Sequence, residues 1–361
     1  MATIFFTGFP GFLGSELLWR VLERSPAATG LCLVQPKFED LARRRAAELE
    51  AAHPGVKGRI AIALGDITTP GLGLPPSAAE DVTEIFHLAA VYDLSVTREL
   101  AMKVNVDGTR HTLDFAAACP RLERFHYVST CYVSGRYEGT FTEADLIKGQ
   151  TFQNFYEETK YLAEVDVQER MKAGLPVTIY RPGIVVGDSH TGATQKFDGP
   201  YYVIRWLLKQ PTFLAFLPVP GNPKNHVVNV IPRDYVLDAL LYLSGLPQSK
   251  GKVYQLAEPN PLTVDEILRV TAQATGRRVL RIPMPKGLAK WTLRYVPGVY
   301  RLMQIPAASV DYFVHPTRYT SDNTQADLAG SGITAPPFAS YAPHLAAFVR
   351  ANPDIESKAM V

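Results

Sequence analysis

The sequence predicts an α/β fold, a doubly wound parallel sheet with a smaller, interleaved C-terminal domain. Short apolar segments alternate with longer segments of helical periodicity along the first two thirds of the chain. This alternation is typical of parallel strands joined by crossover helices. A glycine-rich turn separates the first apolar segment from the first helical one. A length of 361 residues suits one large α/β unit or two domains.

The expected elements follow one another in a regular order. Predicted strands occupy residues 2–6, 30–35, 59–64, 84–90, 124–130, 178–180, 227–230 and 253–256. Predicted helices occupy residues 12–22, 100–119, the segment that contains Tyr156, and residues 263–276. Residues 188–225 interrupt this order with Gly, Pro and aromatic residues, which indicates a separate substructure.

The turn after the first strand reads Thr7-Gly8-Phe9-Pro10-Gly11-Phe12-Leu13-Gly14. Glycines allow a tight turn and let a pyrophosphate approach the backbone closely. The helix that begins there offers free N–H groups and the positive end of its dipole to phosphate. The turn therefore predicts a Rossmann dinucleotide-binding domain over residues 1–187 plus 226–257. Residues 188–225 plus 258–348 are then the substrate-binding region, and 349–361 a tail.

The end of the second strand bears on the choice of dinucleotide. An acid at this position would bond the ribose hydroxyls of NAD and repel a 2′-phosphate. The sequence has Gln35 there, followed by Lys37, with Arg44 in a run of three arginines soon after. Loss of the acid and a nearby cation favour NADP(H) over NAD(H). The alternative interpretation of the arginines is a solvated helix face.

Composition narrows the class of function. Lys plus Arg number 37 and Asp plus Glu 35, so the net charge of +2 indicates no nucleic-acid partner. No apolar run is long enough to span a membrane, and the first strand leaves no room for a leader segment. Three cysteines without a pairing pattern favour a reducing, cytoplasmic location. Eight scattered histidines predict no metal site.

Several motifs, in this order, resemble those of the extended short-chain dehydrogenase/reductases. They are Thr7-Gly8-x-x-Gly11-x-x-Gly14, His87-Leu88-Ala89-Ala90, Asn105-Val106-x-Gly108-Thr109, Ser129-Thr130, Tyr156-x-x-x-Lys160 and Arg181-Pro182-Gly183. Within that superfamily the chain is most similar to the fatty acyl-CoA reductase and thioester reductase branch, with its male-sterility-type NAD-binding domain. Gly11-Phe12-Leu13-Gly14, Gly65-Asp66-Ile67 and Val128-Ser129-Thr130-Cys131-Tyr132-Val133 carry this finer likeness. Many acyl reductases have Arg where this chain has Gln35.

The resemblance implies the roles of the candidate catalytic residues. Tyr156 is the expected proton source for a carbonyl oxygen, and Lys160, one helical turn away, is expected to lower the pKa of the phenol. Lys160 would also bond the nicotinamide ribose. The Thr130 hydroxyl would hold the substrate oxygen, with Ser129 as the second choice. Asn105 would steady a water-linked proton path.

Further contacts to the cofactor are expected from residues at other strand ends. Asp66 is expected to contact the adenine, with a plain turn residue as the alternative. The small side chains after the fourth strand would let the nucleotide lie against them. The complete predicted set adds Ile67, Leu88, Ala89, Ala90, Pro182, Gly183 and Val185 to the turn residues, Gln35, Lys37 and Arg44.

The resemblance implies an NADP(H)-dependent oxidoreductase that reduces an acyl thioester, acyl-CoA or an acyl group on a separate carrier protein, to aldehyde or alcohol. Lys196, Arg205 and Lys209 could form a basic rim for the thioester's phosphate. The alternatives are a dehydrogenase of a free ketone or alcohol, steroid-like or flavonoid-like, and a non-catalytic dinucleotide-binding protein. A homodimer is expected by analogy. Of the aromatic C-terminal segment, Trp291, Tyr295, Tyr300 and Met303 are expected in the core rather than on a membrane-docking surface.

Overall fold

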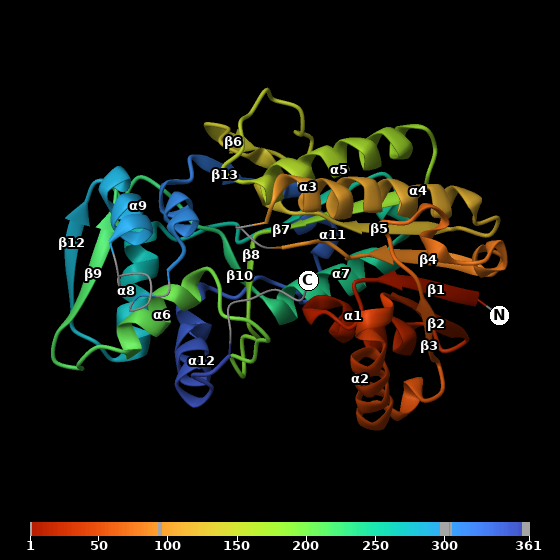
Figure 1. Cartoon of the computed structure of the whole chain (residues 1–361), viewed down its shortest axis with the longest axis horizontal. Coiled ribbons are helices and arrows are strands. Elements are labelled where there is room, and N and C mark those ends of the chain that lie inside the picture. The colour runs from red at the N-terminus through yellow and green to blue at the C-terminus, as the bar shows by residue number, and fades with distance from the viewer. Residues whose placement is uncertain (1, 93–95, 297–302, 304, 356–361) are drawn as a thin grey trace.

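A seven-stranded parallel sheet forms the centre of the computed structural model, which describes residues 2–92, 96–296, 303 and 305–355 (Figure 1). Its strand order is β11-β7-β5-β4-β1-β2-β3, and every pairing is parallel. The strands are β1 (Ala2–Thr7), β2 (Ala28–Val34), β3 (Ile60–Leu64), β4 (Val82–His87), β5 (Arg124–Val128), β7 (Val177–Pro182) and β11 (Val253–Leu256). The predicted doubly wound sheet is confirmed.

Helices cover both faces of this sheet. In Figure 1, α3 (Arg98–Ala101), α4 (Gly108–Ala118) and α5 (Phe155–Lys172) lie above it. Below it lie α1 (Phe12–Arg24), α2 (Glu39–Ala52) and α7 (Arg233–Gly245). Each face has its own core: Leu17, Ala42 and Leu240 pack on one side, and Leu113 and Val167 on the other.

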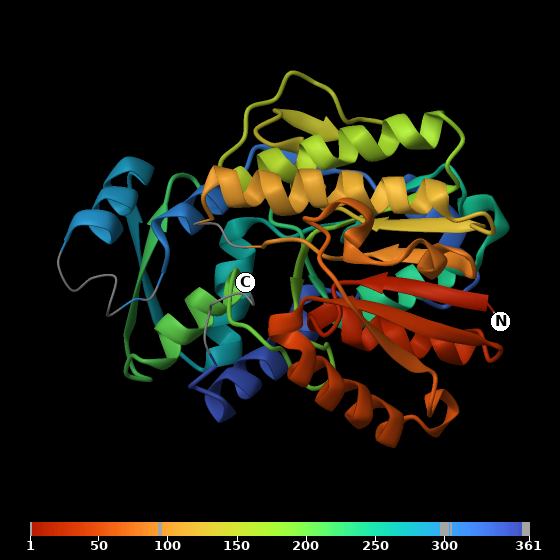
Figure 2. The ribbon, with the colours of Figure 1, turned by 45° about the vertical axis from the view of Figure 1, so that its right-hand side comes forward.

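One long helical run carries the predicted helix 100–119. A π-helical turn, Met102–Asp107, joins α3 to α4, and Figure 2 shows the run lying alongside α5. The strand ends that the prediction placed in the sheet are shifted by one to three residues. β4 ends at His87, for example, and Leu88–Ala90 form the loop that follows.

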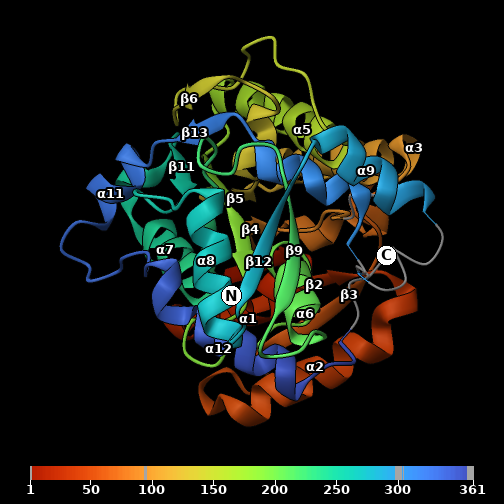
Figure 3. The same ribbon diagram turned by 90° about the vertical axis from the view of Figure 1, so that its left-hand side faces the viewer.

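The smaller part lies at one end of the molecule, where a two-stranded parallel sheet pairs β9 (Ala215–Pro220) with β12 (Val279–Met284) (Figure 3). Around it lie α6 (Pro200–Leu208), α8 (Val264–Thr275), α9 (Lys286–Tyr295), α12 (Phe338–Ala351) and the 3₁₀ segment η8 (Ala307–Val314). Thr263 and Glu266 form a capping box that begins α8.

Short pairings connect the two parts. They are β8 (Ile184–Val186) with β10 (Val230–Pro232), and β6 (Gly139–Phe141) with β13 (Thr317–Tyr319). α11 (Asp322–Leu328) contacts β11, so residues from the predicted substrate region return to the central sheet. The remaining elements are 3₁₀ turns at Pro36–Phe38, Pro54–Val56, Pro70–Gly73, Pro76–Ala79, Cys131–Ser134 and Pro247–Ser249. The division into domains stays a prediction.

Two of the aromatic residues expected in the core lie at the surface. Trp291 is 54% exposed and Tyr295 60% exposed, so that expectation is wrong for both. The reason is that α9 turns Ala289 and Leu293 inward, which leaves the other side of the helix uncovered. Met303 is half-buried against the same cluster, and Tyr300 lies outside the described residues.

No helix in the described ranges combines the length and apolar character needed to cross a membrane. Within the same residues, no three His, Cys, Asp or Glu side chains are grouped so that they could hold a metal ion.

Candidate active site

A large cavity of about 1370 Å³ opens at the carboxyl ends of the central strands. This is the edge at which doubly wound sheets bind ligands, at the point where the strand order reverses between β1 and β4. One wall combines the glycine turn, the ends of β4 and β5, and the first turn of α5. The opposite wall comes from α6, α8, α9 and η8 of the smaller part.

The glycine turn is closed too tightly for side chains. A Cβ on Gly8, whose φ is +90°, would lie 2.9 Å from the backbone nitrogen of Ala89. On Gly11 and Gly14 it would lie 2.7 and 2.5 Å from the Gly8 carbonyl oxygen. Thr7 fixes the turn, since its Oγ1 lies 2.7 Å from His87 Nδ1 and accepts a hydrogen bond from Ala89 N.

The start of α1 has the properties of an anion site. Among the described residues, no side chain caps its first N–H groups, and its first turn contains no acid. These groups face the cavity beside the glycines, so they and the dipole would hold a pyrophosphate. The residues present therefore fit a dinucleotide.

The nucleotide end of the cavity contains Gln35, Lys37 and Asp66. Gln35 Nε2 donates to Asp66 Oδ2 at 2.9 Å, so the amide occupies the carboxylate that the β3 end supplies. Lys37 reaches the cavity beside them. Arg44 is exposed on α2 and does not line the cavity, while its neighbours pair with Glu39, Glu16 and Glu48. This agrees with the solvated-face interpretation of the arginines.

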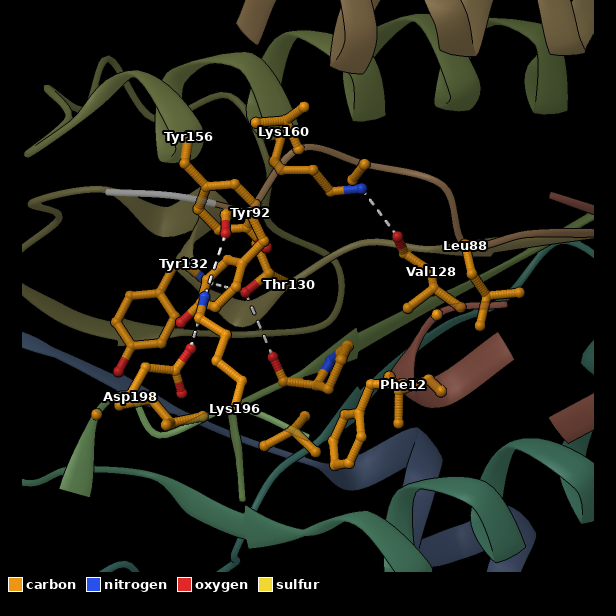
Figure 4. A pocket seen from close by; sticks show the side chains of 18 of the residues that line it. Phe12, Leu88, Tyr92, Val128, Thr130, Tyr132, Tyr156, Lys160, Lys196 and Asp198 are labelled. Atoms are coloured by element: carbon orange, nitrogen blue, oxygen red, sulfur yellow. Dashed lines mark hydrogen bonds and ion pairs between the residues drawn. The ribbon is translucent and has the colours of Figure 1, made fainter. Parts of the chain in front are cut away.

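Tyr156 and Thr130 meet at the other end of the cavity (Figure 4). Tyr156 stands in the first turn of α5, which the Asn154 side chain caps, and Thr130 follows β5. A side-chain hydrogen bond from Thr130 lowers the pKa of Tyr156, but burial outweighs it and raises that pKa above its ordinary value. Tyr156 thus keeps its proton at neutral pH.

Lys160 points away from Tyr156, toward β5 (Figure 4). Its Nζ donates to Tyr127 Oη at 2.9 Å and to the Val128 carbonyl at 2.8 Å. Burial lowers the pKa of Lys160 to about 7. The predicted lowering of the Tyr156 pKa by Lys160 is absent from this structure, because the ammonium is held by the β5 backbone.

Ser129 and Asn105 serve the frame of the site. Ser129 lines the cavity, but its hydroxyl donates to the buried carboxylate of Glu164. Asn105, on the π turn, does not line the cavity. Its side chain bonds both backbone groups of Val91 and the Thr159 hydroxyl, which ties the loop after β4 to α5.

The cavity contains every other predicted site residue. These are Thr7, Gly8, Phe9, Pro10, Gly11, Phe12, Leu13, Gly14, Gln35, Lys37, Asp66, Ile67, Leu88, Ala89, Ala90, Ser129, Thr130, Tyr156, Lys160, Pro182, Gly183 and Val185. Only contact with a bound cofactor or substrate would test the roles predicted for them.

Sequence reasoning missed the polar wall opposite Tyr156. The ion pair Lys196–Asp198, at 2.9 Å, faces the cavity, and Tyr92 packs edge-on against Tyr156 with 4.9 Å between ring centroids (Figure 4). Of the three cations expected at the rim, Lys196 alone lines the cavity. These residues lie in loops without periodicity, so no sequence pattern pointed to them. Cys131 is buried, which raises its thiol pKa and removes it as a nucleophile.

Comparisons with known proteins agree with this site. A family model described as male sterility protein, an NAD-binding domain, matches residues 6–240. A linear gramicidin synthase of Brevibacillus parabrevis is 29% identical over 278 residues, which are 73% of this chain and 5% of that protein. The fatty acyl-CoA reductase wat of Drosophila melanogaster is 27% identical over 281 residues, 66% of this chain and 53% of that protein. The chain therefore spans a small piece of one relative and about half of the other.

A solved structure covers almost the whole chain. The terminal R domain of the myxalamid PKS-NRPS biosynthetic pathway superposes with a TM-score of 0.83 and 26% identity over 98% of this chain and 91% of that one. The parallel sheet, the glycine turn and the Tyr156–Lys160 helix are those of an NAD(P)-dependent enzyme of the extended short-chain dehydrogenase/reductase class. Since the matching model covers more than half of the sequence, the chain belongs to the male sterility protein family of NAD-binding domains.

Proposed function

We propose that this enzyme reduces an acyl thioester, acyl-CoA or carrier-bound, to an aldehyde or alcohol with NADP(H). One observation carries the proposal: the same cavity joins the dinucleotide cradle, the Tyr156–Thr130 pair and an apolar wall from the smaller part. Val203, Leu268, Leu293 and Phe313 belong to that wall, and an acyl chain would lie along them. Relatives that include a fatty acyl-CoA reductase support this class of substrate.

The residues of the site can perform the proton chemistry of such a reduction. When bound, the nicotinamide supplies a hydride to the carbonyl carbon. Thr130 would hold the carbonyl oxygen, and Tyr156 would give it a proton, a contribution of about 10²–10⁴-fold in rate. Release of the thiol then leaves an aldehyde, and a second hydride and proton would give the alcohol. Lys160 would bond the nicotinamide ribose and leave its β5 contacts to do so.

NADP(H) is the proposed cofactor because Lys37 is placed beside Gln35 at the cavity. A 2′-phosphate would meet this cation, whereas Asp66 is already engaged by Gln35. A comparison of kcat/KM for NADPH and NADH tests this, and Lys37→Glu should reverse the preference. An unchanged preference in that variant would remove Lys37 from the proposal.

The thioester would arrive as acyl-CoA or on a separate acyl carrier protein, in the cytoplasm, with homodimer formation retained as a prediction. These parts of the proposal are supported by the free, buried thiols of Cys32, Cys119 and Cys131 and by relatives that include a linear gramicidin synthase.

The test mixes the purified chain and NADPH with acyl-CoAs of graded length and follows the loss of NADPH absorbance. Chromatography of the products distinguishes aldehyde from alcohol. Turnover with thioesters and the release of free CoA are expected. Turnover of free ketones or alcohols alone would assign the cavity to a different substrate.

A further inference from the structure

Six large apolar side chains form an uncovered surface at the end of the smaller part. We define it as the apolar end face: Phe216, Leu280 and Ile282 on the β9–β12 sheet, and Leu288, Trp291 and Tyr295 on α9. Each of the six is between 41% and 60% exposed. The sheet and α9 lie together at this end of the molecule (Figures 1 and 3), and α9 contacts β9.

The strand register gives the sheet one covered and one open side. Ala215, Leu217 and Val219 alternate along β9 and pack into a buried cluster with α6 and α8. Phe216 therefore points to the opposite side, and its register partner on β12 is Leu280. Ile282 follows two residues later on the same side, so the open side is apolar.

Helix α9 is also divided into two sides. Ala289 and Leu293, four residues apart, are buried against a cluster that includes Tyr202 and Ile305. Leu288, Trp291 and Tyr295 recur at helical spacing on the side left open. Leu293 also lines the cavity, so α9 separates the substrate wall from the apolar end face.

The sequence around this surface is entirely basic. Between Glu266 and Asp311 it contains no Asp or Glu, but it contains Arg269, Arg277, Arg278, Arg281, Lys286, Lys290, Arg294 and Arg301. Some of these cations are paired: Lys286 and Lys290 with Asp311, and Arg281 with Asp265. Arg278 and Arg294 are exposed and, in the described part of the chain, have no carboxylate partner.

We propose that the apolar end face docks the enzyme on a lipid surface that carries anionic headgroups. A helix with Leu, Trp and Tyr on one side and Lys and Arg beside it is typical of helices that lie in the membrane interface. Tyrosine and tryptophan prefer this region because one end of the side chain is apolar and the other polar. Anionic headgroups complement the basic segment, whereas a second copy of the chain would bring like charges together. The docking does not depend on the proposed function.

The docked enzyme would hold its acyl-binding wall close to the lipid. Leu293 and Trp291 lie on opposite sides of one helix, so a helix diameter of about 10 Å separates cavity and membrane. Acyl substrates of long chain partition into membranes, so this arrangement would shorten their path if the enzyme reduces acyl thioesters as proposed.

Co-sedimentation with vesicles tests the proposal on the full chain without any turnover. Phosphatidylcholine vesicles are compared with vesicles that contain about one third phosphatidylglycerol. Binding should rise at least about fivefold with the anionic lipid and fall with added salt. The variant Leu288→Ser/Trp291→Ser/Tyr295→Ser should bind at least about tenfold more weakly, and Arg278→Gln should reduce binding to the anionic vesicles only.

The matched control is Ile147→Ser, which removes an equally apolar and 69% exposed side chain far along the chain from this surface. It should bind like the original protein. Circular dichroism and NADPH binding report whether the triple variant is folded, and quenching of tryptophan fluorescence by brominated lipid should follow Trp291 in the folded original.

Three outcomes would overturn the proposal. One is an absence of binding to anionic vesicles, or equal binding by the folded triple variant. Another is that the triple variant loses binding to an acidic acyl carrier protein while the original chain never binds vesicles. The last is a dimer, detected by light scattering, that the triple substitution dissociates.

Discussion

Tyr156 and Lys160 illustrate how the residue scale departs from a simple motif. They stand one turn apart on α5, yet Lys160 bonds Tyr127 and Val128 while Tyr156 faces Thr130. Burial acts on both groups: it keeps the proton on the phenol and loosens it from the amine. A catalytic arrangement with both groups on the ligand requires Lys160 to exchange its present partners.

Replacement of the phenol tests the proton source. We expect Tyr156→Phe to lose about 10²–10⁴-fold in kcat while the affinity for NADPH changes little, since only the proton donor is removed. Steady-state kinetics and fluorescence titration of the cofactor measure the two effects. Tyr92→Phe, which keeps the edge-on packing partner, is the control. Retained turnover in Tyr156→Phe would show that another group supplies the proton.

The buried amine predicts a pH-dependent stability. The native pKa of Lys160 is about 7 against 10.5 in the unfolded chain, so the unfolded state holds this proton more tightly between those values. Lys160 thus lowers stability most below about pH 7, and the cost declines as the pH rises toward about 10. The stability gained by Lys160→Met, from urea unfolding, should be larger at about pH 6.5 than at about pH 9.5. Equal gains would show that the amine keeps its ordinary pKa.

At the scale of elements, α5 joins the site to the sheet through a buried ion pair. Arg181 on β7 and Glu164 on α5 meet at 2.6 Å, with both side chains fully buried. Arg181 also donates to the carbonyls of Thr142 and Asp145, and Ser129 donates to Glu164. The pair therefore fixes α5, β7 and the end of β5 relative to one another.

Removal of one partner should be costly. We expect Glu164→Ala to lower the free energy of unfolding by about 3–5 kcal/mol, because Arg181 would remain buried and unpaired. Chemical denaturation measures the change. The control on the same helix is Asp166→Ala, whose partner Arg110 is 52% exposed, and its effect should stay below about 1 kcal/mol. Similar effects of the two substitutions would contradict the structural role of the buried pair.

The elements that the sequence predicted well are those with strong local signals. Apolar runs and the glycine turn identified the strands and the start of α1, because burial on both faces and a backbone without Cβ atoms leave a clear pattern. The positions of Asn105 and Arg44 were not predictable in this way. A π turn shifts the face of a helix, and a helix exposed to solvent shows the same charges whether or not a ligand lies nearby.

At the scale of the whole molecule, the cavity belongs to two regions distant in sequence. Gly8 and Tyr156 contribute one wall, and Leu268, Leu293 and Ala307 the other. The sequence predicted the first wall from motifs. The second could not be predicted, because its loops and short helices are placed by tertiary packing rather than by local periodicity.

Substitution in the second wall should change the preference for chain length. Ala307→Trp would place a large side chain where a methyl group now borders the cavity. We expect kcat/KM for long acyl thioesters to fall by about tenfold or more, and that for short ones to change little. Thermal unfolding and NADPH affinity are the controls for the fold and the nucleotide end. A parallel loss for all chain lengths would place Ala307 away from the acyl path.

The continuity of the cavity has a kinetic consequence. Among the described residues, no protein wall divides the space beside the glycine turn from the space beside Tyr156, since one set of lining residues runs through both. A dinucleotide in its cradle would itself complete the boundary against which the acyl group rests. Binding should therefore follow a compulsory order, coenzyme before thioester, and product inhibition by NADP⁺ should be competitive with NADPH and not with the thioester. Random addition of the two substrates would mean that each finds a complete pocket by itself.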